Sequence, residues 1–123
     1  MRINLYRIGG ALGLLAVALG AFGAHALKPL LMSNLTVETF KTAVLYHFIH
    51  ALLILSLASS RHHSDQHLKI ITTLALAGTL LFSGSLYLLA TVRWMWLGPI
   101  TPIGGLLFIT AWSFVIFGAK KAS

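Results

Sequence analysis

Two histidines within a long apolar stretch are the residues of this sequence best suited to chemistry. His47 and His50 lie three residues apart, so a helix places both imidazoles on one face, with Tyr46 on the adjoining side. At a rise of about 1.5 Å per residue, they lie roughly 9 and 13 Å beyond Lys41 along such a helix. If the stretch crosses a membrane, that depth is inside the hydrocarbon, where ionisable groups are costly and therefore informative.

Other polar residues are expected on the same side of the membrane. His25 closes the first apolar stretch, and Glu38 opens the second. Late in the third stretch lie Ser83, Ser85 and Tyr87. Because successive spans run antiparallel, we expect these side chains to form a polar cluster with the two histidines in the extracytoplasmic half of the protein.

Three interpretations of this cluster stay open. In the first, His47 and His50 are neutral, hydrogen-bond to Tyr, Ser or backbone carbonyl groups, and hold the helices in register, since burial in a low dielectric favours neutral imidazole. In the second, His25 and Glu38 form the mouth of a ligand or proton pathway that continues to His50. In the third, His25, His47 and His50 are weak candidates for metal ligands, because two His at this spacing supply only part of a tetrahedral shell. We expect the first, with no cofactor.

The motifs of familiar enzyme classes are absent from the sequence. It contains no Gly-x-Ser-x-Gly elbow, no His-Glu-x-x-His and no phosphate-binding Gly-rich loop that ends in Lys. A dyad of Ser83 or Ser85 with His47 is the one catalytic arrangement that remains conceivable. We therefore expect a non-enzymatic protein without catalytic residues.

The composition indicates that lipid is the solvent. Of 123 residues, 58% are hydrophobic and 9% are charged, against about 25% charged in an ordinary soluble domain. The net charge of +7 is spread in ones and twos between apolar runs rather than gathered on one face, which argues against a nucleic-acid partner and for contact with a lipid bilayer. The absence of Cys excludes disulfides and thiolate metal sites.

Four stretches approach the roughly 20 apolar residues that a helix needs to cross a bilayer. We predict an all-α fold, an integral membrane four-helix bundle that forms one transmembrane domain over 1–123. Its helices are expected at about 5–27, 37–60, 67–90 and 102–119. Thr36 and Thr101 are expected to cap the second and fourth helices, and Pro102 suits a first helical position. The first stretch also resembles a secretory signal, but it is longer than the roughly 7 to 15 residues of a signal core.

The distribution of Lys and Arg predicts the orientation of the bundle. Six of these residues lie at the two termini and in the loop between the second and third helices, and three lie on the opposite side. The positive-inside rule therefore places both termini in the cytoplasm. Three histidines of that loop, His62, His63 and His67, could bind a divalent metal weakly together with Asp65, but we expect them to form a solvated polar turn.

Small residues recur at the intervals that let helices approach closely. Between helices in lipid the hydrophobic effect contributes little, so association depends on close backbone contact and interhelical hydrogen bonds. The pattern fits packing within the chain, and it also fits a homo-oligomer or a membrane protein partner. Trp112 is expected near mid-membrane, where its indole N–H needs a hydrogen-bond partner. The small-residue pairs are Gly9 with Gly13, Gly20 with Ala24, and Gly104 with Gly105.

Four strings of the sequence together resemble a known family. They are GAFGAH at 20–25, FKTAVLYHFIHAL at 40–52, LFSGSLYLLA at 81–90 and TPIGG at 101–105. The chain resembles, over nearly its whole length, the YgdD-like family of small bacterial inner-membrane proteins of unknown function, which has an animal transmembrane relative. The resemblance implies a multi-pass protein of the cell inner membrane with no established activity. It also implies that His47 departs from the family, where Gln is common, and this suits a hydrogen-bonding role better than a metal or proton role.

Overall fold

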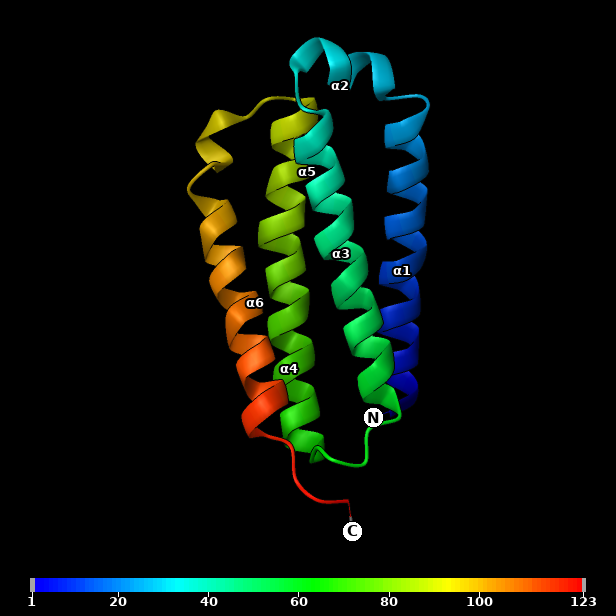
Figure 1. Ribbon diagram of the computed structural model, residues 1–123, viewed down its shortest axis with the longest axis vertical. Helices are drawn as coiled ribbons and strands as arrows, with labels where there is room; N and C mark the ends of the chain where they lie inside the picture. Colours follow the sequence, from blue (N-terminus) through cyan, green and yellow to red (C-terminus); the bar gives the residue numbers. More distant parts are fainter. Residues whose placement is uncertain (1, 123) are drawn as a thin grey trace.

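Four long apolar helical stretches run antiparallel in the computed structural model, which describes residues 2–122 (Figure 1). Each stretch is long and apolar enough to cross a membrane, and no strand occurs among the described residues, so the predicted all-α class is confirmed. The elements are α1 (Arg2–Ala24), α2 (Lys28–Asn34), α3 (Val37–Ala58), α4 (Asp65–Gly78), the π-helical turn η1 (Thr79–Ser83), α5 (Gly84–Thr91), the 3-10 turn η2 (Met95–Leu97) and α6 (Ile100–Phe117).

The third span is one continuous rod made of α4, η1 and α5, and α3 lies between this rod and α1 (Figure 1). The rod in turn packs against α6, mainly through α4 and η1. One apolar cluster joins α1, α3, the rod and α6, and its most enclosed side chains are Leu5, Ile54, Leu68 and Ile71. A smaller cluster surrounds Phe40 at the other end of the bundle. The row of helices leaves much of the surface of α1 and α6 uncovered by the rest of the chain.

Both ends of the described chain lie at one end of the bundle, beside the loop that joins α3 to α4 (Figure 1). We call this the terminal end, and the opposite end, which carries α2, the α2 end. The Arg2 guanidinium donates to the Ser60 carbonyl at 2.6 Å, and the Lys120 N–H donates to the His62 carbonyl at 2.7 Å. The His63 ring also contacts the Val115 carbonyl at 2.9 Å. These loop histidines therefore tie the end of the chain to the bundle and are not a purely solvated turn.

The connection between the first two spans contains a short helix that we did not predict. The first span ends at Ala24 rather than near residue 27, and α2 begins at Lys28 with Pro29 in its first turn, where no N–H is needed. Leu35 ends α2 in a left-handed conformation with φ of 59°. The Asn34 amide then donates to the Ala90 carbonyl at 3.1 Å. The connection is thus docked on the end of the third span.

Neither threonine that we expected to cap a helix does so with its side chain. The Thr36 hydroxyl donates to the Ala90 carbonyl at 2.7 Å, and it makes no bond to the first turn of α3. The reason is that carbonyl groups at the end of α5 have no helical partner and accept this hydrogen. Thr101 lies inside α6, which begins at Ile100, and its hydroxyl meets that of Ser85.

The π-helical turn η1 also departs from the regular helix expected over 67–90, and it lies where α6 comes closest to the third span. A Cβ added to Gly104 would lie 2.8 Å from Phe82 Cα and from the Leu81 carbonyl carbon. A Cβ added to Gly78 would meet the Phe108 ring and the Gly104 carbonyl oxygen at 3.3 Å. The backbones of the two helices are therefore in direct contact.

Candidate functional site

His50 is enclosed in the middle of the bundle with a partner on each ring nitrogen. Its Nδ1 lies 2.7 Å from the Tyr46 carbonyl oxygen, and its Nε2 lies 3.1 Å from the indole Nε1 of Trp112. Because a carbonyl only accepts and an indole N–H only donates, Nδ1 carries the hydrogen and Nε2 is the acceptor. The ring also stacks on Phe108, with centroids 3.5 Å apart and planes 9° apart.

His47 is equally buried but has a partner on one nitrogen only. Its Nδ1 lies 2.8 Å from the Tyr87 hydroxyl oxygen, which joins α3 to α5. No atom of residues 2–122 makes a hydrogen bond with Nε2. Tyr87 is held in turn by an edge-on contact with Phe40, with ring centroids 5.2 Å apart.

Two serines complete the polar network and link the third span to its neighbours. The buried Ser83 hydroxyl donates to the Ala43 carbonyl of α3 at 2.8 Å. Ser85 donates to the Phe82 carbonyl within its own helix and meets the Thr101 hydroxyl of α6. These bonds form separate pairs that each link two different helices, and we call the set of side chains that make them the polar network. Its members are His47, His50, Ser83, Ser85, Tyr87, Thr101 and Trp112.

The depth of the polar network differs from the one we expected. His47 lies ten residues after Val37 and eleven before Ala58, the ends of α3, which is about 15 Å from each end of the helix. The His50–Trp112 pair lies further toward the terminal end. The network therefore crosses the middle of the bundle and is not confined to one half, because His47 lies near the midpoint of α3 and His50 lies closer to Ala58.

His25 and Glu38 do not join the histidines of α3. His25 lies in the turn after α1 and is exposed, and Glu38 is exposed and forms an ion pair with Lys41, with 3.6 Å between Nζ and Oε1. Among residues 2–122 no three His, Asp or Glu side chains are close enough to share a metal ion. The weak metal candidates His25, His47 and His50 thus do not form a common site. Tyr46 contributes its carbonyl to the network, while its ring packs on Phe82 at 4.7 Å between centroids.

The small residues singled out in the sequence occupy different environments. Gly9 is buried where a Cβ would meet Leu55, and a Cβ at Gly20 would touch Val44 at 3.4 Å. Gly13 and Gly105 have room, since the nearest atoms would lie 4.0 and 3.8 Å from an added Cβ, and Ala24 is exposed. Gly104 has the least room for a Cβ of the set. Gly23 also lacks room, because a Cβ there would collide with the Phe40 ring, although its spacing in the sequence did not single it out.

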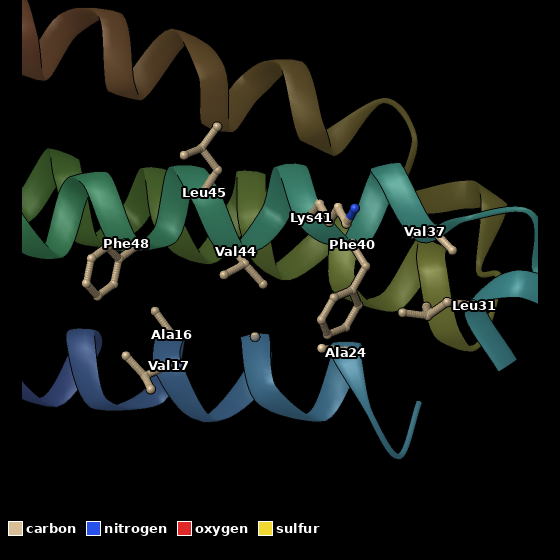
Figure 2. A pocket seen from close by; sticks show the side chains of 12 residues that line it. Ala16, Val17, Ala24, Leu31, Val37, Phe40, Lys41, Val44, Leu45 and Phe48 are labelled. Carbon is tan, nitrogen blue, oxygen red and sulfur yellow. The ribbon is translucent and has the colours of Figure 1, made fainter. Parts of the chain in front are cut away.

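Two of the grooves on the surface of the described chain are apolar and border α1. The first, which we call the Lys41 groove, has a volume of about 460 Å³ and lies between α1 and α3. Figure 2 shows Phe40, Val44 and Phe48 projecting from α3 toward α1 across it. The charged residue of its lining is Lys41, near the α2 end.

The second groove, which we call the His47 groove, has a volume of about 410 Å³ and lies between α1 and the third span. Its floor includes His47 and Tyr87. Its walls are formed by Leu12, Leu15 and Leu19 of α1 and by Leu76, Thr79, Leu80 and Gly84 of the third span.

Comparison with known proteins places the chain among membrane proteins without an assigned activity. The family model "Protein of unknown function (DUF423)" matches residues 19–105. The UPF0382 membrane protein YwdK of Bacillus subtilis is 37% identical over 116 residues, which cover 93% of this chain and 94% of the relative. The UPF0382 inner membrane protein YgdD of Escherichia coli is 38% identical over 110 residues, which cover 89% of this chain and 83% of the relative. No solved structure matches the chain significantly. The chain, which has four apolar spans and is similar to the membrane proteins YwdK and YgdD, therefore belongs to the DUF423 family of proteins of unknown function.

Proposed function

We propose that this chain is a non-enzymatic, multi-pass protein of the cell inner membrane whose polar network organises helix packing and whose surface holds a phospholipid. Both termini face the cytoplasm in this proposal, on the basis of the six Lys and Arg at the terminal end and the three at the α2 end. The YgdD relative, which is named an inner membrane protein, supports the location.

The observation that carries the packing role is the complete hydrogen bonding of His50. Both ring nitrogens have partners, and each partner allows only one role, so the ring is held in a single tautomer. A proton path through His25, Glu38 and His50 would need a nitrogen of His50 that can exchange its hydrogen. It would also need His25 and Glu38, which are exposed, to lie near His50. This arrangement therefore favours a structural role over conduction.

The packing role is tested by His50→Ala. Removal of the ring leaves the Trp112 indole N–H without a partner and opens a cavity beside Phe108, so we expect a loss of about 2 kcal/mol or more in the free energy of unfolding. Unfolding of the purified protein by SDS measures this free energy. The matched control is His25→Ala, because His25 is exposed at the end of α1. Equal stability of the two variants would count against the proposal.

The lipid role rests on the Lys41 groove. An acyl chain fits a groove with an almost wholly apolar lining. The Lys41 ammonium lies near its α2 end, and because its ion pair with Glu38 is exposed and therefore weak, it can exchange that partner for a phosphate. Lys41 lies four residues after Val37, or about 6 Å into the span, which is within reach of the headgroup level for a long flexible side chain.

Native mass spectrometry from nanodiscs that contain phosphatidylglycerol tests this role. Ala24 lines the groove, so Ala24→Leu fills it and should reduce the fraction of protein that retains a phospholipid. Ala21 is also exposed on α1 but does not line the groove, so Ala21→Leu is the matched control and should retain lipid as the wild type does. Equal retention by both variants would remove the Lys41 groove as a lipid site.

A further inference from the structure

The His47 groove contains a polar atom that the packing role leaves unused. Among residues 2–122 two buried side-chain polar atoms have no hydrogen-bond partner, His47 Nε2 and Thr72 Oγ1. His47 is 2% exposed and lies in the floor of a groove whose walls are hydrocarbon apart from Thr79. The Thr79 hydroxyl already donates to the Ala75 carbonyl at 2.8 Å. Among the polar side chains that line the groove in the described chain, His47 is therefore the one with a buried polar atom that has no hydrogen-bond partner.

The partners of His47 determine what this nitrogen can do. Within residues 2–122 the Tyr87 hydroxyl has no other hydrogen-bond partner, and a phenol donates more readily than it accepts, so its hydrogen goes to Nδ1. In neutral imidazole the other nitrogen then carries the hydrogen, and Nε2–H is a donor. The Leu12 backbone of α1 lies close enough to interact with the ring, but its carbonyl already accepts within that helix, and no contact with Nε2 has the geometry of a hydrogen bond. His47 Nε2–H is consequently a donor without a well-formed hydrogen bond in the described chain.

The depth of this donor restricts the molecules that can satisfy it. His47 lies about 15 Å from either end of α3, which is the middle of a hydrocarbon core about 30 Å thick. The ester carbonyls and phosphates of a phospholipid remain near the interface, and its acyl chains contain no acceptor. A suitable ligand must be neutral, soluble in the membrane and equipped with an acceptor oxygen that can enter the hydrocarbon.

We propose that the His47 groove is a binding site for a lipophilic quinone, in which a ring carbonyl accepts a hydrogen bond from His47 Nε2–H and the hydrocarbon tail lies along the leucines of α1. A volume of about 410 Å³ is in the usual range of small-molecule sites, roughly 300 to 1,000 Å³. The π-helical turn supports this assignment independently, because Thr79 and Leu80 of η1 form part of the wall and such turns are frequent at functional sites.

Access to the nitrogen requires a small rearrangement of the wall. Nε2 is covered in the unliganded groove, and the side chains on the α1 side are leucines. Leu15 is 48% exposed to the membrane, so its side chain can change rotamer without a cost in core packing. A ligand therefore enters from the bilayer between α1 and the third span, and the His47–Tyr87 bond stays in place.

The test measures binding of a decyl-tailed benzoquinone to the full-length protein in phosphatidylcholine nanodiscs, with empty nanodiscs as background. Nitrogen NMR of histidine-labelled protein reports on His47 Nε2, and decylbenzene serves as a probe of the same tail without carbonyls. We expect a saturable shift of the His47 signal with the quinone and none with decylbenzene. His47→Leu should weaken quinone binding about fivefold, the effect of one hydrogen bond.

A second variant keeps the proposal testable if His47→Leu does not fold. A Cβ at Gly84 meets only Leu80 Cδ1 among the described residues, at 4.0 Å, so Gly84→Leu fills the groove and spares the His47–Tyr87 bond. A Cβ at Gly10 meets no atom of residues 2–122 within 4 Å, which makes Gly10→Leu the matched control. We expect Gly84→Leu to abolish saturable quinone binding and Gly10→Leu to preserve it.

Two results would overturn the quinone site. One is equal binding of the quinone and decylbenzene, which would mean that the groove holds only hydrocarbon chains. The other is quinone binding by Gly84→Leu that matches Gly10→Leu. Neither result bears on the packing role, because that role is measured by the stability of His50 variants.

Discussion

At the scale of single residues, the molecule contains two imidazoles three positions apart with different hydrogen-bonding states. His50 has a donor partner and an acceptor partner, from Trp112 on α6 and from its own helix. His47 has one partner, Tyr87, and one nitrogen without a partner in the described chain. Both rings are 2% exposed and lie near mid-depth, so they differ in their hydrogen-bond partners and not in burial or depth. We accordingly assign His50 to packing and His47 to ligand binding.

The His50–Trp112 bond yields a prediction at this scale. Trp112→Phe and His50→Leu each remove one partner and leave a polar group unpaired, whereas the double variant removes both, so its loss should be smaller than the sum of the single losses. Interhelical hydrogen bonds in membranes give coupling energies of about 0.6 kcal/mol. A double-mutant cycle based on SDS unfolding measures the coupling. Trp96→Phe, at an exposed ring near the α2 end, is the control, and additive losses would contradict the prediction.

At the scale of elements, the contact between α6 and η1 depends on the absence of a side chain at Gly104. Phe82 and Leu81 of the π-helical turn leave no space for a Cβ there. A π turn adds one residue to a helical turn, so it changes the helical phase of every residue that follows. Ser85 and Tyr87 lie after η1, and they meet Thr101 and His47 respectively. The turn therefore affects where the polar network forms as well as how closely α6 approaches.

Neighbouring glycines of α6 provide the prediction for this element. Gly104→Ala pushes a methyl group into backbone, which cannot move aside, so we expect a loss of about 2 to 3 kcal/mol in the free energy of unfolding. Gly105→Ala adds the same methyl group where the nearest atom is 3.8 Å away, and it should be neutral or stabilising by up to about 1 kcal/mol through helix propensity. SDS unfolding measures the free energy of unfolding of the two variants. Equal losses would show that backbone contact at Gly104 is not the controlling feature.

At the scale of the whole molecule, the bundle has two chemically different ends. The terminal end joins the start of α1, the α3–α4 loop and the end of the chain through Arg2, His62 and His63. The α2 end is covered by a short helix that docks on α5 through Asn34 and Thr36. Since even numbers of spans return the chain to the same side, the orientation of one end determines that of the other.

The proposed orientation can be measured because the chain contains no Cys. Ser33 on α2 and Gln66 at the start of α4 are exposed at opposite ends, so each can carry a single cysteine. With cytoplasmic termini, a membrane-impermeant maleimide added to intact cells should label Ser33→Cys and spare Gln66→Cys, and both should react after lysis. The reverse labelling would invert the orientation.

The sequence by itself determined the solvent, the helical class, the four spans and the family of this protein. These properties follow from local composition, since a run of about 20 apolar residues becomes a spanning helix wherever it occurs. It also indicated that Trp112 needs a partner and that His47 and His50 share a face. It did not identify the partners, which are 62 residues away for His50 and Trp112 and 40 for His47 and Tyr87.

Only the tertiary structure decided these pairings, the π-helical turn, the docked helix α2 and the two grooves. In lipid, spans that are apolar on every side have no hydrophobic face that specifies their rotation and relative depth, so small-residue contacts and hydrogen bonds must do so. Gly104 sets the approach of α6, and that approach brings the Trp112 indole to His50 and leaves His47 to face Tyr87 and the groove. The packing role of His50 and the unpaired donor of His47 therefore depend on how the four spans are assembled.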